Sequence, residues 1–460
     1  MKKYKTSIFI FTRDLRLHDN TSLLHALKDS MTVIPIFIFN PVQINKQNEY
    51  KSNNCVQFMC ECLGELNKNL KNYNSRLFYF YDKPEKVIKD ILKEENINAV
   101  YMNKDYTPFA NLREENIKNV CEKSSVDFIV HEDYLLTGNA DAVKNQNNQP
   151  YVKFTPFLNS AKNIKISKPR MNKFDNYMKK TKKFTDEFTD DVQVFYKENN
   201  NIFVRGGREN ALKILKNVSK HKNYNSERDY LVDGNTTGLS AYLKFNVVSI
   251  REVYEHFRNK LPRNNKLITQ LYWRDFYMIV IYHFPHVIGH NMKQHYKIKW
   301  KHNEKLFDKW KNGLTGFPIV DAGMRQMNET GYMFNRVRMI VANFLVKILH
   351  IDWREGEKYF AQRLVDYDPA NNNGGWQWCA STGTDSQPYF RYFNPWSQAE
   401  KYDENCEYIK KWIPELNNVE TKDILKWYDV YNNYKNIKYP KPIIKDIREQ
   451  IKKTLEMFKQ

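Results

Sequence analysis

The stretch VDYDPANNNGGWQWCASTGTDSQPYFRYFNP, residues 365–395, is the most informative part of this 460-residue chain. The stretch is dense in Asn, Gly and Trp, which fill a plain helical core poorly. Its tryptophans, Trp376 and Trp378, can be core aromatics, and that interpretation stays open. The neighbouring carboxylates and amides need hydrogen-bond partners if they are buried. A polar, planar ligand offers such partners to Asp366, Asp368, Asn371, Asn372 and Asn373.

Two helical faces upstream have a similar character. Asn335, Arg338 and Met339 share one face at i, i+3 and i+4, with Arg336 off it. Arg338 lies on a largely apolar helix and needs an anion, for which Asp366 is the candidate. A second face, at i, i+3, i+4 and i+7, either stacks and pairs a base or belongs to the core. It consists of Gln270, Trp273, Arg274 and Tyr277.

The turn Thr236-Thr237-Gly238-Leu239-Ser240 precedes a helical run. Its hydroxyl and N–H groups can cradle phosphate at a helix N-terminus, although such turns often only cap a helix. HExxH, Walker and GxSxG motifs are absent from the sequence, and the 11 histidines lack ligand spacing. We therefore expect neither a metal nor a nucleophile.

The hydrophobic period changes along the chain. Short apolar segments at 7–11, 33–39, 77–81, 99–103 and 128–130 alternate with helical ones at 22–30, 54–70, 84–95 and 109–123. This pattern predicts a parallel sheet covered on both faces. Helical periods dominate later, at 210–216, 249–260, 266–283, 321–330, 335–350, 353–365 and 406–412. We expect an α/β domain (1–134), a long linker (135–204) and an all-α domain (205–460).

Charge points to a polyanionic partner. The chain has 73 Lys+Arg and 53 Asp+Glu, a net charge of +20, although a lysine-rich proteome produces the same balance. Residues 162–183 contain nine basic residues and one acid. They are either a solvated linker or a phosphate-facing surface. Six cysteines form no disulfide framework, and no apolar stretch reaches ~18 residues. We expect a soluble, reduced, intracellular protein.

With these motifs in place, the sequence resembles the photolyase/cryptochrome family, most closely the class I cyclobutane pyrimidine dimer photolyases. The resemblance covers nearly the whole chain. It rests on FTRDLRLHDN (11–20), FTPF (154–157), TTGLSAYLKF (236–245), LYWRDFY (271–277), TGFPIVDAGMRQ (315–326), NRVRM (335–339), DWREGEKYF (352–360) and NNGGWQWCASTGTDSQPYFRYFNP (372–395). It implies a Rossmann-like parallel sheet domain, an all-α FAD-binding domain and light-driven DNA repair.

The resemblance also assigns the cofactor residues. It implies one non-covalent FAD, active as FADH⁻, contacted by Tyr224 and the turn Thr236, Thr237, Gly238, Leu239 and Ser240. Arg338 and Asp366 would pair beside the flavin ring, with Tyr367 adjacent. Asp368 would hydrogen-bond the ring, and Asn372 would face its N5 atom. Plant-type cryptochromes carry Asp and animal cryptochromes Cys at the position of Asn372, so this amide favours a repair enzyme.

Three tryptophans match the family's electron-transfer chain: Trp376 nearest the flavin, then Trp353, then Trp300 at the surface. The substrate side would use Trp273 and Trp378 to flank a flipped-out dimer, with Asn335 and Met339 lining its pocket. Further DNA contacts would come from Arg228, Arg336 and Gln398, and from Arg274 and Tyr277 on the face of Trp273.

Gln270 departs from the class I pattern, which has Glu at this position. An amide brings no charge, and Gln here resembles (6-4) photolyases and some cryptochromes. The motif Met333-Phe334-Asn335-Arg336 nevertheless reads as class I. The segment 103–113 stands where folate-binding members place polar contacts, but it offers Phe109 and Ala110. Folate is therefore not assured as the antenna chromophore, and a deazaflavin, FMN or no second chromophore stay open as alternatives.

The leading hypothesis is light-driven dimer repair. The alternatives are a cryptochrome-type blue-light photoreceptor, a (6-4) photolyase and a non-catalytic nucleic-acid binder. The expected partner is UV-damaged DNA, without a membrane or an obligate protein partner. We expect a monomer located wherever DNA is, in nucleus or cytoplasm.

Overall fold

The computed structural model describes residues 2–231 and 235–459. The chain divides into two compact units. The first contains residues 1–198, 204–220 and 238–285, and the second contains 199–203, 221–237 and 286–460. The domain boundaries expected near 134 and 204 follow composition and hydrophobic period, and they stay a prediction.

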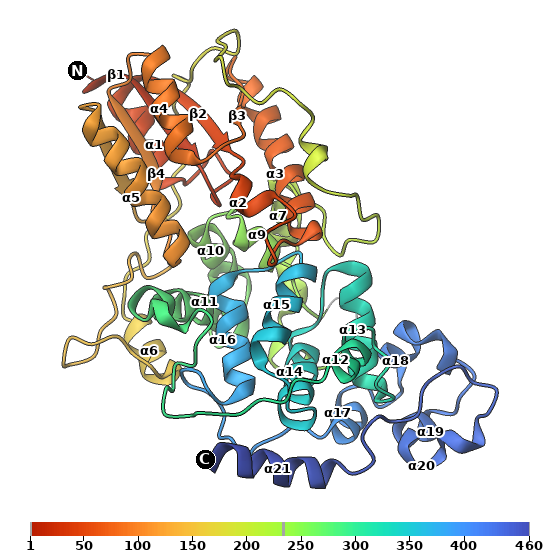
Figure 1. Ribbon diagram of the computed structural model, residues 1–460. Coiled ribbons are helices and arrows are strands. Elements are labelled where there is room, and N and C mark those ends of the chain that lie inside the picture. The colour runs from red at the N-terminus through yellow and green to blue at the C-terminus, as the bar shows by residue number, and fades with distance from the viewer. Residues whose placement is uncertain (1, 232–234, 460) are drawn as a thin grey trace. The chain divides into compact units, whose positions relative to one another are not determined.

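A five-stranded parallel sheet forms the centre of the first unit, in the order β3-β2-β1-β4-β5 (Figure 1). All five predicted strands are confirmed, with ends displaced by a few residues at most. The strands are β1 Tyr4–Phe11, β2 Ser30–Ile38, β3 Phe78–Phe80, β4 Ala99–Asn103 and β5 Asp127–His131.

Successive side chains of a strand point to opposite faces of the sheet. Both faces are apolar here because the strands consist largely of apolar residues. Ile8, Ile36 and Val100 share a buried cluster with Ile88 and Ile117, so α4 and α5 cover their face. Helix α1 packs against β1, β2 and β4. The helices of this part are α1 Thr21–Asp29, α2 Pro41–Ile44, α3 Asn53–Lys71, α4 Pro84–Glu94 and α5 Pro108–Lys123.

Helices from later in the chain complete the first unit. They are α6 Phe154–Ala161, α7 Arg208–Lys216, α9 Ser240–Lys244, α10 Ile250–Lys260 and α11 Lys266–His283, with a short 3₁₀ turn at Val192–Phe195. Buried ion pairs join α10 to the sheet region, because Arg251 donates to Asp19 and Asp133 at 2.8 Å each. Arg16 also pairs with Asp133 at 2.5 Å.

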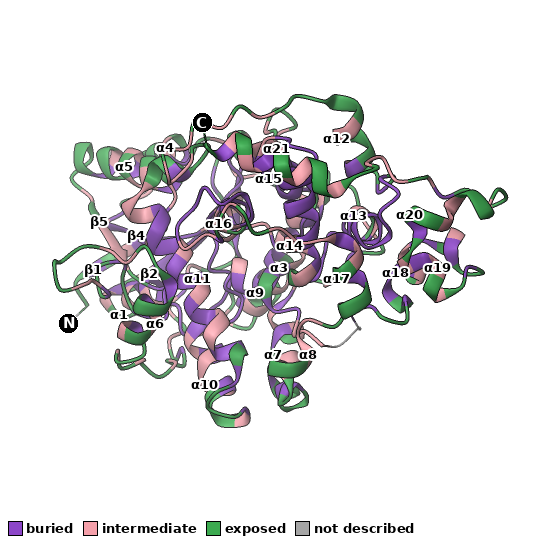
Figure 2. Cartoon of the chain, turned by 90° about the horizontal axis from the view of Figure 1, so that it is seen from below, coloured by how far each residue is buried: buried purple, intermediate pink, exposed green. Residues whose placement is uncertain are grey.

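The described part of the second unit is built from helices. They are α8 Tyr224–Glu227, α12 Glu304–Lys311, α13 Pro318–Thr330, α14 Asn335–Asn343, α15 Trp353–Arg363, α16 Pro369–Ala380, α17 Pro395–Tyr402, α18 Glu407–Trp412, α19 Thr421–Leu425, α20 Trp427–Val430 and α21 Ile447–Lys459. Helix α13 is buried along most of its length (Figure 2).

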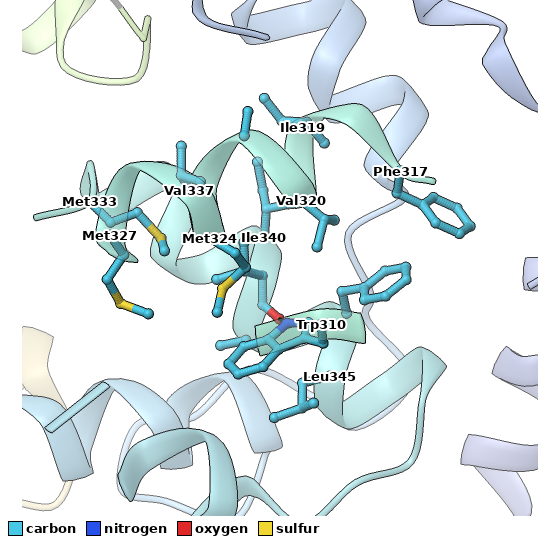
Figure 3. Close-up of a cluster of buried hydrophobic side chains, with 14 of the residues drawn as sticks. Trp310, Phe317, Ile319, Val320, Met324, Met327, Met333, Val337, Ile340 and Leu345 are labelled. Atoms are coloured by element: carbon cyan, nitrogen blue, oxygen red, sulfur yellow. Dashed lines mark hydrogen bonds between the residues drawn. The ribbon is translucent and has the colours of Figure 1, made fainter. Parts of the chain in front are cut away.

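One large apolar cluster holds this unit together. Trp310 is fully buried and packs with Met324, Ile340 and Leu345 in its interior (Figure 3). Its indole N–H donates to the carbonyl oxygen of Val341 at 3.0 Å. The aromatic core therefore has its polar atom satisfied, as burial requires.

The predicted helix at 335–350 is confirmed with a change of winding. Residues Asn335–Asn343 are α-helical, and Phe344–Ile348 form a π-helical turn. Such turns insert extra backbone into a helix and are frequent near functional sites. The turn brings Lys347 to a fully buried position, where it donates to Ser381 Oγ at 2.9 Å and Tyr389 O at 3.2 Å.

Candidate functional site

The site residues expected from the sequence fall into both compact units. Gly238, Leu239, Ser240, Gln270, Trp273, Arg274 and Tyr277 belong to the first unit. The second contains Tyr224, Arg228, Thr236, Thr237, Trp300, Asn335, Arg336, Arg338, Met339, Trp353, Asp366, Tyr367, Asp368, Asn372, Trp376, Trp378 and Gln398.

Arg338 and Asp366 form the expected ion pair. Arg338 Nη2 lies 2.9 Å from Asp366 Oδ2 and 3.1 Å from Oδ1, and Arg338 Nε donates to Met333 O at 2.8 Å. The carboxylate is 4% exposed and the guanidinium 25% exposed. Since charge-assisted hydrogen bonds are strong and directional, this pair is a fixed polar element with one open side.

Tyr332, which the sequence reasoning missed, stands at the centre of this polar group. Burial raises its pKa to about 12, while the Arg338 charge lowers it and the Asp366 charge raises it. Its hydroxyl hydrogen-bonds Thr236 and interacts with Tyr224. Thus Tyr224, Thr236, Arg338 and Asp366, predicted from separate motifs, all influence the pKa of one buried hydroxyl. The only available signal was its place three residues before the Asn335 helix.

The Asn- and Gly-rich stretch forms a helix that the sequence reasoning did not identify. Asp368 is the N-cap of α16, and its Oδ1 accepts from Asn371 N at 3.0 Å and Asn371 Nδ2 at 2.9 Å. Pro369 follows as the first helical residue. The pair Asp-Pro was the missed signal, because an acidic cap followed by Pro is a common helix start.

Asn372 reaches from α16 to α15. Its Nδ2 donates to the carbonyl oxygen of Glu357 at 3.0 Å and to Glu357 Oε1 at 3.3 Å. Its Oδ1 accepts no hydrogen bond from any described residue, so this amide keeps one polar edge for another partner. Burial raises the pKa of Glu357 to about 7, opposed by the Asn372 hydrogen bond. Glu357 is 6% exposed and was also missed from the sequence.

Trp376 packs directly on α15. It is 2% exposed, and its indole N–H is buried without an acceptor among the described residues. Its ring lies against Gly356, where a methyl group would approach Trp376 Cη2 at 2.1 Å. Phe360 meets the same ring edge-on, with centroids 4.9 Å apart. Only a glycine admits the indole at this position of α15.

The other two predicted electron-transfer tryptophans lie at the start of α15 or next to a residue that bonds the segment just before it. Trp353 is its first residue, fully buried, and donates from Nε1 to Asn291 Oδ1 at 3.0 Å. Trp300 is half-buried, and its neighbour Lys301 donates from the backbone to His350 O at 2.8 Å. Trp376 contacts α15 three residues after Trp353. Helix α15 therefore positions Trp353 and Trp376, whereas the ring of Trp300 meets Phe458 of α21 edge-on.

The predicted DNA contacts of the second unit form two groups. Asn335 Nδ2 lies 3.6 Å from Met339 Sδ, which confirms their shared helical face. Arg336 pairs with Asp229 at 2.9 Å, and Arg228 lies 3.8 Å from the same carboxylate. Trp378 stacks on Phe393 and is half-buried, and Gln398 keeps a buried Oε1 without a described partner.

The α11 face divides in the structure. Trp273 stacks on Phe154, the first residue of the FTPF motif, with centroids 3.5 Å apart, and Tyr277 packs beside it. Gln270 is half-buried. Arg274 is 8% exposed and donates to Tyr134 O at 2.6 Å and, at longer range, to Asn246 Oδ1. Its guanidinium donates to acceptors inside the first unit. We therefore no longer count Arg274 among the expected DNA contacts.

The segment 103–113 contains a buried charge cluster. Burial raises the pKa of Asp105, but the charges of Arg13, Arg113 and Lys244 outweigh this effect and lower it. Arg13 Nη1 lies 3.6 Å from Asp105 Oδ1. Arg113 has Nε and Nη2 buried without a hydrogen-bond partner among the described residues. These donors suit an anionic or carbonyl-bearing ligand.

Comparisons with known proteins identify the family. The family model described as DNA photolyase matches residues 7–173, and that described as FAD binding domain of DNA photolyase matches residues 267–460. The chain is 35% identical to the deoxyribodipyrimidine photo-lyase of Alkalihalophilus pseudofirmus, over 98% of this chain and 97% of that protein. The chain belongs to the DNA photolyase family.

Two further relatives agree with this assignment. The deoxyribodipyrimidine photo-lyase of Buchnera aphidicola from Acyrthosiphon pisum is 38% identical over 98% of this chain and 96% of its own. An archaeal photolyase from Sulfolobus tokodaii, solved with two FAD molecules that imply a novel light-harvesting cofactor, superposes with a TM-score of 0.88. It is 40% identical and covers 99% of both chains. This chain is accordingly an FAD-binding enzyme of the photolyase family.

The residues present fit a flavin. The Trp376 N–H is buried without a partner among the described residues, the side-chain hydrogen bonds of Asn372 use only its Nδ2, and the Arg338 side chain keeps 25% exposure. Gly238, in the predicted phosphate turn, has φ of +67°, a left-handed conformation that favours glycine. Within residues 2–231 and 235–459 we find no helix long and apolar enough to cross a membrane.

Proposed function

We propose that this chain repairs cyclobutane pyrimidine dimers in DNA with light. Tyr224, residues 236–240, Arg338, Asp366 and Asp368 would hold FAD, which in its reduced form would supply the light-driven electron for splitting the cyclobutane ring. The proposal is supported by relatives named deoxyribodipyrimidine photo-lyase that are 35–38% identical over nearly the whole chain. The single observation that carries it is the polar group of Tyr332, Arg338 and Asp366, inside the region matched by the FAD-binding family model.

In this proposal each polar residue has a defined task. Tyr224 and residues 236–240 bind the phosphates and sugar of the cofactor. Asp366 holds Arg338 beside the flavin ring, and Asp368 and Tyr367 contact the ring. Asn372 offers its free carbonyl oxygen to N5 while Glu357 fixes its other edge. An amide is suited to this position because it adapts to a protonated or unprotonated nitrogen without adding a charge.

Trp376, Trp353 and Trp300 would deliver an electron from the surface during activation. Indole is readily oxidised, and burial in an apolar cluster keeps water from the inner rings. The role is supported by the position of Trp353 on α15 and by the contact of Trp376 with Gly356 of the same helix. Trp300, the half-buried member, would exchange electrons with an external reductant.

On the substrate side, Trp273 and Trp378 would flank the extruded dimer, with Asn335, Met339 and Tyr277 around it and Arg228, Arg336 and Gln398 toward the DNA. Trp273 is already stacked on Phe154, which fixes the ring and leaves one face for a base. Extrusion costs a few kcal/mol and least for a damaged pair, so the lesion itself favours binding. A monomer acting on DNA needs no further partner.

Gln270 supports a second candidate, repair of (6-4) lesions. Its amide can donate and accept, but it cannot supply the carboxyl group that class I enzymes place at the dimer. A cryptochrome-type photoreceptor is the third candidate, and it would bind the same cofactor without repair.

The deciding experiment uses purified, reduced, FAD-loaded protein under blue light. Oligonucleotides containing either a cyclobutane dimer or a (6-4) lesion are illuminated, and restored thymines are counted per absorbed photon. We expect repair of the cyclobutane dimer only. Repair of the (6-4) lesion alone would move the enzyme to that branch, and repair of neither would favour the photoreceptor.

We also propose a second chromophore in the first unit. Arg13, Asp105 and Arg113 would hold it, since Arg113 has two buried N–H groups without a described partner. The second flavin of the Sulfolobus tokodaii photolyase supports this idea. Absorbance of the extracted cofactors would identify it as a second flavin, a deazaflavin or a folate.

A further inference from the structure

The segment 162–183 concentrates the positive charge of the chain. It has nine basic residues and one acid, so its net charge is +8 out of +20 for 460 residues. Elsewhere several lysines pair with an acid on the same helix. Examples are Lys93 with Asp90 and Lys453 with Glu449. A lysine-rich proteome would scatter charge along the chain, so composition alone does not account for this segment.

The basic side chains of the segment are exposed and without ion-pair partners among the described residues. Lys182 is the exception, since it pairs with Glu95. The exposed set consists of Lys162, Lys165, Lys168, Arg170, Lys173, Lys179, Lys180 and Lys183. Like charges held together without counter-charges raise the local potential and attract a polyanion.

The backbone of the segment is fixed to the first unit. Arg170 exchanges two hydrogen bonds with Asp19, at 2.7 and 2.9 Å. Val33 of β2 donates to Asn176 O at 2.9 Å, and Met178 donates back to Val33 O at 2.7 Å. Lys180 donates to Asn74 O at 2.9 Å. The segment is therefore held against β2 by an isolated parallel bridge at Tyr177 and is no loose tether.

This attachment favours the interpretation of the segment as a phosphate-facing surface. A solvated tether would lose backbone entropy on binding, whereas here only the lysine side chains have to be ordered. Lysine is a compact point charge that suits phosphate, phosphate contacts carry no sequence information, and most of these side chains are lysine. The segment therefore suits a phosphate backbone bound without regard to sequence or damage.

We propose that residues 162–183 form a second DNA-binding surface, which contacts the phosphates of undamaged duplex DNA. This proposal rests on the proposed repair function, because it names a further contact with the same substrate. It would hold the enzyme on DNA during the search for a lesion. The extrusion of the dimer and the chemistry would not depend on it.

The test compares two variants with equal net charge. The first is Lys165→Gln, Lys168→Gln, Lys173→Gln and Lys179→Gln in one chain. The control removes four exposed lysines without a described ion-pair partner from elsewhere in the first unit. It is Lys46→Gln, Lys83→Gln, Lys89→Gln and Lys123→Gln. Affinity for an undamaged duplex is measured by fluorescence anisotropy across salt concentrations, with FAD-loaded protein.

Each lost phosphate contact lowers the slope of log affinity against log salt by ~0.9. We expect the linker variant to lose a slope of about 2 or more, and the control to lose less than about 0.5, each contact counting ~0.9. Dimer splitting per absorbed photon on saturating substrate should be unchanged. Equal slopes in both variants would overturn the proposal and point to an acidic protein as partner. A wild type that repairs nothing, with the slope difference intact, would refute the repair function alone.

Discussion

Replacement of Gly356 by alanine tests the contact that positions Trp376. A Cβ atom at Gly356 would lie 2.1 Å from Trp376 Cη2, 2.5 Å from Cζ3 and 2.6 Å from Leu345 Cδ2. Carbon atoms in van der Waals contact lie ~3.5 Å apart or more, so the indole would have to move by about 1.4 Å. Phe360 packs against the ring on another side and leaves it little room.

The expected magnitude follows from two opposing effects. An extra methyl group in a close-packed core typically costs ~1–3 kcal/mol. Alanine in a helix gains up to ~1 kcal/mol over glycine. Because the displaced group is a rigid bicyclic ring, we take the upper figure and expect a net loss of about 2 kcal/mol in the free energy of unfolding.

Gly375 provides the matched control, since it lies on α16 beside Trp376 and an added Cβ there meets nothing within 4 Å. Gly375→Ala should gain up to ~1 kcal/mol, so the two variants should differ by about 3 kcal/mol. Denaturant unfolding followed by tryptophan fluorescence measures the difference. Photoreduction of the flavin should slow only in Gly356→Ala. Two variants equal within ~0.5 kcal/mol would refute the packing of Trp376 on Gly356.

Three further predictions concern the site. Trp376→Phe should block light-driven flavin reduction, whereas chemically pre-reduced enzyme should still repair; normal photoreduction in this variant would mean that electrons enter by another route. Gln270→Glu should preserve or raise the yield of dimer splitting per photon and change substrate binding by no more than ~1–3 kcal/mol. A (6-4) activity that is lost in this variant would argue against the class I assignment. Glu357→Gln should stabilise the protein above pH 7 and have no effect near pH 4. The buried carboxyl keeps its proton up to a pKa of about 7, against 4.5 when unfolded, so stability is lost as pH rises through this window. The gain is at most ~3 kcal/mol, read from unfolding curves at pH 4, 6 and 8, and a gain independent of pH would show that Glu357 does not titrate there.

Hydrophobic period predicted the sheet and most long helices, because both depend on burial of regular faces. The strands 7–11 and 99–103 and the helices 266–283 and 353–365 are each found within a few residues. Helix α16 was missed because Asn, Gly and Trp carry no helical period, and Asp368 and Pro369 start it by capping instead. The π-helical turn at Phe344–Ile348 was also missed, since a change of winding leaves no trace in an apolar run.

The site was predictable where charge or spacing demanded a partner. Arg338 on an apolar helix required an anion, and Asp366 provides it. Tyr332 and Glu357 could not be found in this way, because their significance depends on neighbours distant in sequence. Arg274 shows the opposite error. It shares a helical face with Trp273, but that face points partly into the first unit, where carbonyl oxygens take up its donors. Sequence spacing shows which residues share a helical face, but it does not show what that face contacts in the folded chain.

The tryptophans show why packing and electron transfer are not rival explanations. Trp310, Trp353 and Trp427 are buried with their N–H groups satisfied by Val341 O, Asn291 Oδ1 and Pro440 O. The Trp376 N–H makes no such bond to a described residue. An unsatisfied buried donor lowers the stability of the folded state by ~1–3 kcal/mol. The Trp412 N–H makes no such bond to a described residue either, so the missing bond by itself marks no function. What distinguishes Trp376 is that the chain also places a glycine on α15 to admit its ring, one turn from Trp353. A core that only needed volume there would be served by a side chain at position 356. If Trp376 and Trp353 form part of the proposed electron chain, Gly356 also lets the Trp376 ring lie against the backbone of the helix that begins at Trp353.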